Sequence, residues 1–255
     1  MNHSPLILSL ETATLGGSVW LGRGHTELAF REGDPGISQS NTLLRDIDDC
    51  LRAATLSLEN VDIFACASGP GSFTGLRIGI ATLKALAATL NRPCIGIPTL
   101  NAVAHSAGAS PATVALLPAG RGEVFAQMFS VSNDSGETTV SPADLPAHLS
   151  PNKLIERYGA LQSLCWTGPG AELHREKIES AANEGGIVFR HVSSNQTSLM
   201  ERQGWSVMRN DSNLARHVAA LANQAYKQGA PLAPEDLHAL YVRPSDAELA
   251  KQTND

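Results

Sequence analysis

The stretch ASGPGSFTGLRIGIATLKALAATL, residues 67–90, combines a helical composition with regularly spaced glycines. Glycine recurs at every fourth position, at Gly71, Gly75 and Gly79. Each glycine inside a helix costs about 1 kcal/mol relative to alanine, yet the segment from residue 73 has helical composition. Only Arg77 and Lys84 are charged there, so the helix has almost no face suited to water. We therefore predict an apolar helix over 73–90 whose glycines allow another segment to approach closely.

The residues on either side alternate between strand and helix patterns. Apolar runs at 6–10 and 16–21 predict two antiparallel strands joined by a turn. A buried strand is expected over 61–68 and a short strand at 94–97. Between the hairpin and the strand at 61–68, a helix is expected over 41–56. Its apolar stripe consists of Leu43, Leu44, Ile47 and Leu51. Strands and helices that alternate in this way indicate an α/β sheet.

The pattern starts again after a stretch of small residues. Residues 113–131 predict a strand, a tight turn and a second strand. The segment LCWTGPGAELHREKI (164–178) predicts a strand, a glycine turn and a helix, in the same layout as ACASGPGSFTGLRIG. This similarity indicates a duplicated α/β unit. Between the two segments, Ser141 is expected to cap a further helix, with Pro142 at its first position.

Composition sets limits on function. The 255-residue chain is 42% hydrophobic and 17% charged, which suits one large domain or two smaller ones with packed cores. Its formal net charge of −6 does not suit strong binding to a nucleic-acid backbone, which needs clustered Lys and Arg. A partner would therefore have to supply most of any RNA contact. The four cysteines form no C-x-x-C pair, so we expect reduced core thiols.

Sequence patterns for membranes and for catalysis are missing. No basic segment followed by an apolar run opens the chain, and no run of 18 apolar residues occurs, so a cytoplasmic location is expected. No two of the eight histidines are four residues apart, as a helical metal site would require. A G-x-S-x-G motif and a Cys–His pair are also missing. We therefore expect no catalytic residue and no metal site.

The glycine-bearing helix is open to more than one interpretation. It could be buried between two layers of the monomer, with its opposite stripe facing the protein's own core. Alternatively, one face could be a surface for a partner, either another helix or the same helix of a second copy. The segment SGPGSFTG also places glycines and hydroxyls at a helix N-terminus, as phosphate sites do. It matches neither the Walker A pattern nor G-x-G-x-x-G.

The turn of the first hairpin is the other candidate binding element. In actin-like ATPases an acidic turn between two strands embraces the phosphates and organises Mg²⁺. Here the turn reads Glu11-Thr12-Ala13-Thr14, with no glycine before Gly16. Glu11, Thr12 and Thr14 are therefore weak candidates for cofactor binding, and a plain hairpin turn is an equally good interpretation.

The string GPGSFTGLRIG, from Gly69 to Gly79, resembles the signature of the TsaB (YeaZ) family. Its members are non-catalytic paralogues of TsaD in the synthesis of threonylcarbamoyladenosine in bacterial tRNA. The segments ILSLETAT, RGEVFAQM (121–128) and ALYVRP (239–244) are also similar to family segments. Departures from the family pattern are Glu11 in place of Asp, the triplet Gln39-Ser40-Asn41 in place of one containing His, and Pro118 and Gly120 in place of Asp and Arg.

The resemblance implies an α/β protein with the actin-like ATPase (ASKHA) fold, in which two lobes of mixed sheet are flanked by helices. The first lobe, with the partner-binding helices, would span 1–105, and a smaller α/β lobe would span 106–210. Residues 211–255 would form a C-terminal helix that packs back on the first lobe, followed by a tail.

The resemblance also implies a function. Such proteins are scaffold or activator subunits that bind TsaD, which transfers the threonylcarbamoyl group to adenosine 37 of tRNAs that read ANN codons (t6A modification). A third component, the ATPase TsaE, joins the complex, and tRNA would be reached only through it. TsaB-like proteins alone tend to form homodimers through the same surface. No tightly bound cofactor is expected, with ATP or ADP only at the complex interface. The older glycoprotease (M22 peptidase-like) label would describe an inactive protein.

The expected partner and dimer interface lies on the signature helix. It comprises Gly71, Phe73, Thr74, Gly75, Leu76, Arg77, Ile78, Gly79 and Thr82. On this view the glycines let helices of two subunits approach, and a Gly79→Trp variant should abolish pairing without unfolding the monomer. Two competing functions are a small ATP-dependent phosphotransferase of the actin-like superfamily and direct tRNA binding by this chain alone.

Overall fold

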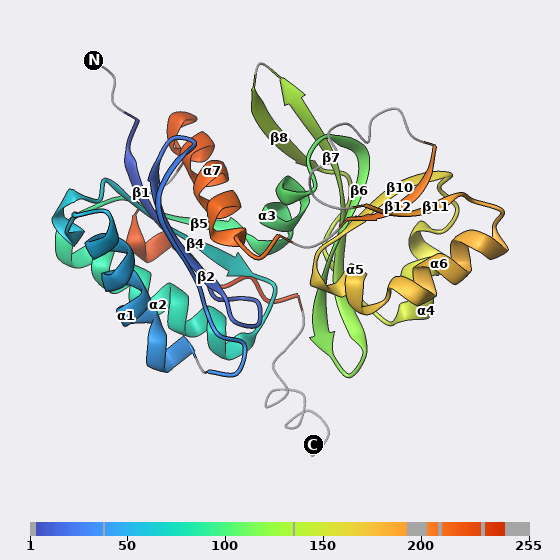
Figure 1. Ribbon diagram of the computed structural model, residues 1–255, viewed down its shortest axis with the longest axis horizontal. Helices are drawn as coiled ribbons and strands as arrows, with labels where there is room; N and C mark the ends of the chain where they lie inside the picture. The colour runs from blue at the N-terminus through green and yellow to red at the C-terminus, as the bar shows by residue number, and fades with distance from the viewer. Residues whose placement is uncertain are drawn as a thin grey trace.

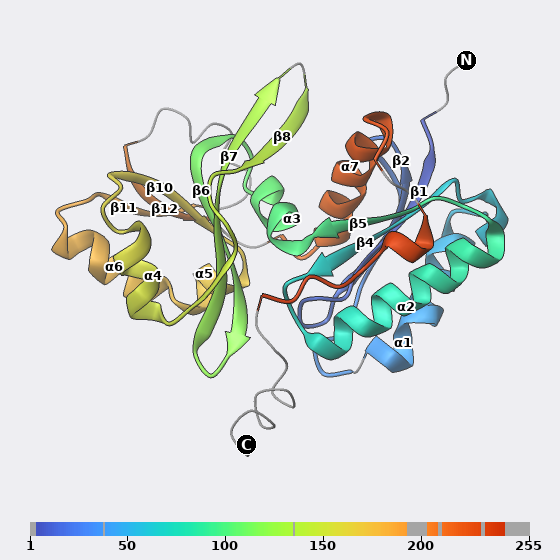
Figure 2. The same ribbon diagram turned by 180° about the vertical axis from the view of Figure 1, so that it is seen from behind.

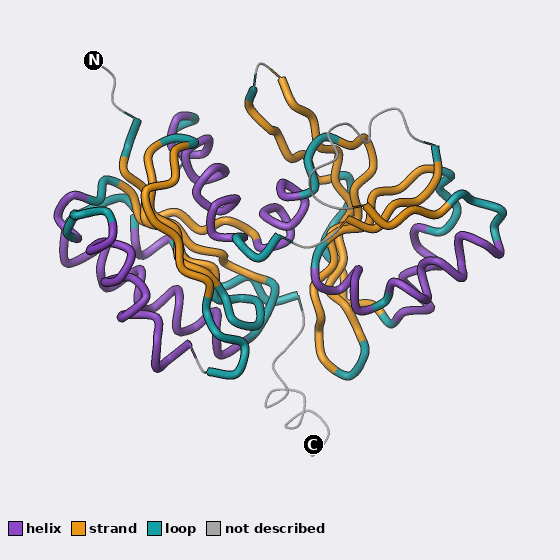
Figure 3. The backbone as a smooth tube through the Cα atoms, viewed as in Figure 1, coloured by secondary structure: helices purple, strands orange, loops and turns teal. Residues whose placement is uncertain are grey.

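Two β-sheets, each with its own helices, stand side by side in the computed structural model (Figure 1). The structure describes residues 4–37, 39–134, 136–192, 203–208, 211–230 and 233–242. Helices α3 (Thr99–Ser106) and α7 (Leu214–Lys227) lie between the two sheets, as the backbone trace in Figure 3 shows. The expected mixed α/β fold of the actin-like type, with two lobes, is confirmed.

The first sheet has the strand order β3-β2-β1-β4-β5. Its strands are β1 (Leu6–Glu11), β2 (Ser18–Arg23), β3 (Thr26–Glu32), β4 (Ile63–Gly69) and β5 (Cys94–Pro98). The hairpin strands β1, β2 and β3 pair antiparallel, whereas β1, β4 and β5 pair parallel. All residues of β1 and β4 are buried, because both faces of the sheet are covered.

Alternate residues of β1 pack against different helices. Leu8 and Leu10 belong to the core under α1 (Gln39–Ala53) and α2 (Phe73–Leu90). On the other face Ile7 packs in one cluster with Ala215 and Val218 of α7. The sheet is therefore a middle layer between two pairs of helices, α1 with α2 and α3 with α7.

The second sheet repeats this plan, with the order β11-β12-β10-β6-β7-β8 and β9 paired to β7. Its strands are β6 (Ser110–Gly120), β7 (Glu123–Asp134), β8 (Glu137–Pro142), β9 (Ala147–Leu149), β10 (Ser163–Thr167), β11 (Phe189–Val192) and β12 (Gly204–Met208). Its helices are α4 (Pro151–Tyr158), α5 (Pro169–Leu173) and α6 (Arg175–Glu184), and short 3-10 turns occupy Leu58–Asn60 and Pro234–Asp236. In both sheets an antiparallel hairpin (β1–β2, β6–β7) is joined by parallel strands that follow it in the chain.

The helix expected to start at Pro142 does not exist, because residues 141 and 142 end strand β8. Helix α4 starts instead at Pro151, where the Ser150 hydroxyl accepts a hydrogen bond from the backbone N–H of Lys153. Both sites have the Ser-Pro pattern of a helix start. The first is followed by Pro146, which would fall inside the helix, lack the required N–H and clash with the preceding turn.

The two halves of the molecule are joined through α3 and α7. Leu100 and Val103 of α3 belong to a core cluster with strands β6 and β7 of the second sheet, while α3 also packs along α7. At the other end of α7, the Lys227 amine lies 2.7 Å from a carboxylate oxygen of Glu137 at the tip of the β7–β8 hairpin. The halves therefore meet at α3 and, separately, at the C-terminal end of α7.

Candidate partner-binding helix and interlobe cavity

The turn between β4 and α2 is tightly packed against its own chain. Gly69 has a φ of +113°, a conformation that favours glycine, and its N–H donates to the Thr99 hydroxyl at 3.0 Å. A Cβ atom at Gly69 would lie 2.4 Å from the backbone oxygen of Leu240. Ser72 then caps α2, since its hydroxyl accepts from the backbone N–H of Gly75 at 3.2 Å.

The glycines of the signature leave space in which the first hairpin turn of the same chain packs against α2. A Cβ at Gly79 would lie 2.1 Å from Thr12 Oγ1, and one at Gly71 would lie 2.5 Å from the backbone oxygen of Ala13. That same oxygen accepts a hydrogen bond from the Ser72 N–H at 2.7 Å. The expectation that these glycines make room for a second subunit is therefore wrong. They make room for residues 12 and 13.

Glu11 holds this turn in place with its side chain. Its carboxylate accepts hydrogen bonds from the backbone N–H groups of Ala13, at 2.6 Å, and Thr14, at 2.8 Å, and from the Thr14 hydroxyl. The residue is 1% exposed, and this burial raises the pKa of its carboxyl, while the hydrogen bonds act in the opposite direction. Both carboxylate oxygens are thus engaged by the turn itself.

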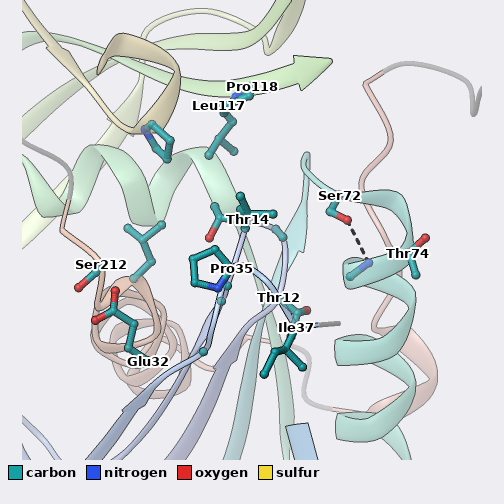
Figure 4. A pocket seen from close by; sticks show the side chains of 18 of the residues that line it. Thr12, Thr14, Glu32, Pro35, Ile37, Ser72, Thr74, Leu117, Pro118 and Ser212 are labelled. Atoms are coloured by element: carbon teal, nitrogen blue, oxygen red, sulfur yellow. Dashed lines mark hydrogen bonds between the residues drawn. The ribbon is translucent and has the colours of Figure 1, made fainter. Parts of the chain in front are cut away.

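A cavity of about 640 Å³ opens beside this turn, between the two lobes (Figure 4). Its volume is in the range of small-molecule sites. Apolar side chains dominate the wall, among them Leu15, Ile37, Ile78, Leu117 and Leu214. Within the described part of the chain, the charged residues of the wall are two acids, Glu32 and Asp211.

A magnesium–nucleotide complex, which the actin-like fold implies at this place, does not fit these residues. The Glu11 oxygens that would organise the metal are turned into the hairpin turn. Basic side chains are the usual charged partners of phosphate, yet the charged side chains of the described wall are the carboxylates of Glu32 and Asp211, and Asp211 is itself paired with Arg216.

The outer face of α2 is long and nearly uncharged. In Figure 2 the helix runs along the outside of the first lobe. Its buried stripe, which includes Ile80, Leu83 and Ala87, packs on the sheet, but only 33% of the helix is buried. The exposed positions are Thr74, Arg77, Ala81, Ala85, Ala88 and Thr89. By length and mean hydropathy, 1.3, α2 also passes the criterion for a membrane span, as helices packed on a sheet often do.

The neighbouring helix α1 extends this face. A groove of about 260 Å³ lies between α1 and α2 and is lined by apolar side chains that include Leu44, Leu51 and Leu86. Leu44, expected on the buried stripe of α1, is 67% exposed. Asp48 and Glu59 also line the groove, and Arg45 and Arg52 are exposed on α1, so charged groups border the apolar part. We call the exposed side of α2 together with this groove the α1–α2 face.

The start of α2 carries a stack of side chains that includes a residue from far along the chain. The Arg77 guanidinium lies 3.8 Å from the centre of the Phe73 ring, and Phe73 packs against Tyr241 with ring centres 5.3 Å apart. Residues 237–242, here called the C-terminal strap, place Tyr241 there. The strap is fixed by hydrogen bonds from Lys84 Nζ to the Leu237 oxygen, at 3.1 Å, and from the Leu240 N–H to the Ser68 oxygen, at 2.6 Å.

A chain of polar side chains joins α3 to α7 behind the cavity. Asp211 Oδ2 lies 3.0 Å from His217 Nε2, and His217 Nδ1 lies 2.8 Å from His105 Nδ1. The hydrogen bond from His217 holds the pKa of Asp211 far below its usual range, and burial lowers the pKa of His105 to about 3. Sequence spacing could not show this pair, because the two histidines come from different helices. No group of metal-binding side chains was found among the described residues.

A family model described as "TsaD: tRNA N6-adenosine threonylcarbamoyltransferase" matches residues 38–245. The chain belongs to this family. The matched range includes α1, α2, the second lobe and the C-terminal strap.

The related proteins within this family confirm the expected resemblance to TsaB and YeaZ proteins. The chain is 35% identical over 127 residues to the tRNA threonylcarbamoyladenosine biosynthesis protein TsaB of Escherichia coli, a match that covers 47% of this chain and 52% of the relative. It is 38% identical over 106 residues to TsaB of Haemophilus influenzae, with 40% of this chain and 42% of the relative covered. The chain thus spans about half the length of the curated TsaB relatives it matches.

A solved structure gives fuller coverage. "YeaZ from Pseudomonas aeruginosa" superposes with a TM-score of 0.68 at 25% identity and covers 93% of this chain and 99% of that one. The family also includes transferases: over 61 residues the chain is 46% identical to the tRNA N6-adenosine threonylcarbamoyltransferase of Protochlamydia amoebophila, with 24% of this chain and 18% of that protein covered.

The structure separates the predicted interface residues into two groups. Gly75, Leu76 and Gly79 are buried inside the monomer, and Leu76, 1% exposed, belongs to the core cluster beneath α7. Placing these three in a partner interface is therefore corrected, because Leu76 and Gly79 are covered by the chain itself and Gly75 faces the interlobe cavity. The remaining predicted residues lie at the surface in whole or in part: Gly71, Phe73, Thr74, Arg77, Ile78 and Thr82. For these six the interface role stays a prediction.

Proposed function

We propose that this protein is a non-catalytic subunit in the synthesis of threonylcarbamoyladenosine in tRNA, and that it binds a TsaD-type catalytic subunit through the α1–α2 face. The TsaD-type subunit would transfer the threonylcarbamoyl group to adenosine 37 of tRNAs that read ANN codons. The observation that carries the proposal is the exposed, nearly uncharged side of α2, an 18-residue helix of which 33% is buried. Continuous apolar surface of this kind marks binding sites for other proteins.

The chemistry of the face suits a second pair of helices. The exposed residues of α2 are small, so the backbone of a partner helix could come close to it. Leu44 and the groove beside it offer a larger apolar contact at one edge. Self-association would use the same face, which makes a homodimer and the heterodimer mutually exclusive.

The proposal assigns the chemical step to the partner. In this chain the Glu11 carboxylate of the first hairpin accepts hydrogen bonds from its own turn. The described cavity wall has no basic side chain that could bind phosphate. Any ATP or ADP in the assembly would then be held at the subunit interface, and a TsaE-type ATPase would join the complex. The net charge of −6 supports indirect contact with tRNA, through the partner.

Reconstitution tests the role directly. The protein is mixed with its cognate TsaD- and TsaE-type proteins, threonylcarbamoyl-adenylate and tRNA, and then omitted. Modification of tRNA should fall to background when this protein is left out. Modification that continues at the full rate without it contradicts the proposal, and tight Mg-ATP binding by this chain alone would favour a phosphotransferase instead.

A surface variant tests the binding face. Ala85→Arg puts a charge in the middle of the exposed side of α2 and should abolish pairing with the TsaD-type subunit, measured by sizing chromatography. Ala143→Arg, at an exposed position in the second lobe, is the matched control and should pair normally. Equal pairing by both variants would exclude the α1–α2 face as the binding surface.

A further inference from the structure

The interlobe cavity has no role in the proposed function, yet its wall has the composition of a small-molecule site. Two large apolar side chains of the wall are exposed, Leu15 at 83% and Ile37 at 46%. Leu15 belongs to the first hairpin turn and Ile37 to the loop after β3. Leu117 and Pro118 contribute from the second lobe (Figure 4). Apolar surface from both lobes therefore surrounds one space of about 640 Å³.

The loops that carry the exposed side chains are held in fixed positions. The Glu11 carboxylate accepts hydrogen bonds from two backbone N–H groups of the first hairpin turn. The loop after β3 is tied to that turn, because the Gly33 N–H donates to the Gly17 oxygen at 3.1 Å. A Cβ at Gly33 would collide with the Gly16 oxygen, so this close approach requires glycine. The cavity is therefore formed before a ligand arrives, which lowers the entropic cost of binding.

One of the two acids on the described wall is left without a partner. Asp211 Oδ2 lies 2.8 Å from Arg216 Nη2 and 3.0 Å from His217 Nε2, so its charge is balanced. Glu32 is exposed, and its carboxylate has no ion pair or hydrogen bond with the residues that the structure describes. Ser212, an exposed hydroxyl, lines the same cavity (Figure 4). The described wall therefore carries one uncompensated negative charge.

Two helix starts also face the cavity, and the chain itself supplies their acceptors. A helix N-terminus attracts anions because its first N–H groups lack partners within the helix. At the start of α7, Asp211 Oδ1 accepts from the Asn213 N–H at 2.9 Å, and Asn213 Oδ1 accepts from the Arg216 N–H at 3.1 Å. At the start of α2, the Ser72 hydroxyl accepts from the Gly75 N–H. Asp211 thus occupies the place of an anion at α7.

We propose that the interlobe cavity binds a small organic cation, an amine on an apolar body, in place of the magnesium–nucleotide complex that the actin-like fold implies. The amine pairs with the Glu32 carboxylate in a charge-assisted hydrogen bond. The apolar body lies against Leu15, Ile37 and Leu117, where its burial supplies most of the affinity. The inference goes beyond the proposed function and is independent of it, because Glu32 and Leu15 lie outside the α1–α2 face.

A matched series of ligands tests the chemical class. Tryptamine, tryptophol and indole-3-acetate present the same indole ring with a positive, a neutral and a negative group at neutral pH. Their binding to the full-length protein is measured by calorimetry, with Mg-ATP as a fourth ligand. We expect tryptamine to bind about 10-fold more tightly than tryptophol, and indole-3-acetate more weakly than either. Absence of saturable tryptamine binding, or tighter binding of indole-3-acetate or Mg-ATP, would overturn the proposal.

Two wall variants test the assigned contacts. Glu32→Gln removes the charge at nearly constant shape, so tryptamine should lose its advantage of about 10-fold while tryptophol binds as before. Ile37→Ser, at an exposed position, should weaken both ligands to the same extent. Glu156→Gln, exposed on α4, is the matched control and should bind as the wild type. Tryptamine binding that is unchanged in Glu32→Gln would contradict the pairing with Glu32. Thermal unfolding without ligand shows that each variant is folded.

The place of binding is checked separately, because the groove between α1 and α2 is also apolar. Methyl NMR spectra should shift at Ile37 and Leu117 when tryptamine is added. Shifts confined to Leu44 and Leu86 would place the ligand in that groove and overturn the inference. Pairing of Glu32→Gln with the TsaD-type subunit should equal that of the wild type. Loss of tryptamine binding with normal pairing therefore supports the inference, whereas a failure of reconstitution concerns the proposed function alone.

Discussion

The two lobes contain the same turn, and its two copies lead to different surfaces. Residues 68–71 read Ser-Gly-Pro-Gly and residues 167–170 read Thr-Gly-Pro-Gly, and each turn follows a strand that pairs with the first strand of a hairpin. The last glycine of each faces the chain of that hairpin. A Cβ at Gly71 would meet Ala13, and a Cβ at Gly170 would meet Leu116 at 2.9 Å. The glycines of both turns thus serve internal packing.

The helices that follow show where the copies diverge. In the first lobe α2 continues for 18 residues with two charged side chains. In the second lobe α5 ends after five residues, and α6 has the sequence REKIESAANE, whose outer side is charged. The glycine turn therefore belongs to the fold, whereas the helices after it differ in surface composition, and the proposed binding face lies on the uncharged one.

The largest expected effect on stability comes from disrupting the contact between Gly79 and Thr12 in the first lobe. Gly79→Leu forces a side chain onto Thr12, 2.1 Å from the position of its Cβ, and should lower the free energy of unfolding by about 3 kcal/mol. Ala85→Leu, on the exposed side of the same helix, should change it by less than about 0.5 kcal/mol. Urea denaturation measures both. A Gly79→Leu protein of normal stability that fails to pair would return Gly79 to the partner interface.

The next effect concerns the junction between the lobes. His105 has its pKa lowered to about 3 by burial, whereas an unfolded histidine titrates near 6.5. The unfolded state therefore binds the extra proton first as the pH falls, so stability is lost from about pH 6.5 downwards, by about 2 kcal/mol at pH 5. A His105→Gln variant should lack this loss in chemical denaturation series between pH 7 and pH 5. The same slope in both proteins would exclude His105 as its source.

The smallest expected effect is a pH dependence of stability that the first hairpin has and the second lacks. The strand end that faces Gly170 is apolar, with Leu116 and Leu117 fully buried, whereas the turn that faces Gly71 contains the Glu11 carboxyl. Burial raises the pKa of Glu11, so the folded state retains a proton that the unfolded state has lost, and stability falls as the pH rises above about 4.5. Glu11→Gln, which can still accept from both backbone N–H groups, should remove this decline. Denaturant midpoints across that pH range provide the measurement, and a decline that persists in Glu11→Gln would contradict the assignment.

Local patterns in the sequence predicted much of the fold. Strands β1, β4 and β10 and the two glycine turns follow from apolar runs and from the Gly-Pro-Gly string, signals that depend only on neighbouring residues. The helix predicted to start at Pro142 is wrong for a reason that is also local, because Pro146 would lie inside that helix and disrupt it.

The candidate site was predicted less completely, because its contacts join distant parts of the chain. Nothing in the spacing of Gly71 and Gly79 says whether Thr12 and Ala13 or a second protein fills the space above them. Tyr241 reaches Phe73 only through the path of the C-terminal strap, which has no periodic pattern. Leu44 lies beside the buried Leu43, and a helical stripe does not show where its edge becomes exposed.

The path of the chain through the first sheet has a consequence for biosynthesis. The apolar side of β1 that includes Ile7, together with Trp20, is covered by α7, which the ribosome makes only after every strand of the second lobe. A growing chain therefore exposes the back of its earliest strands until residues 214–227 emerge. Strands that are translated before the second lobe are thus covered only after it, and during that interval their apolar side is a target for a chaperone.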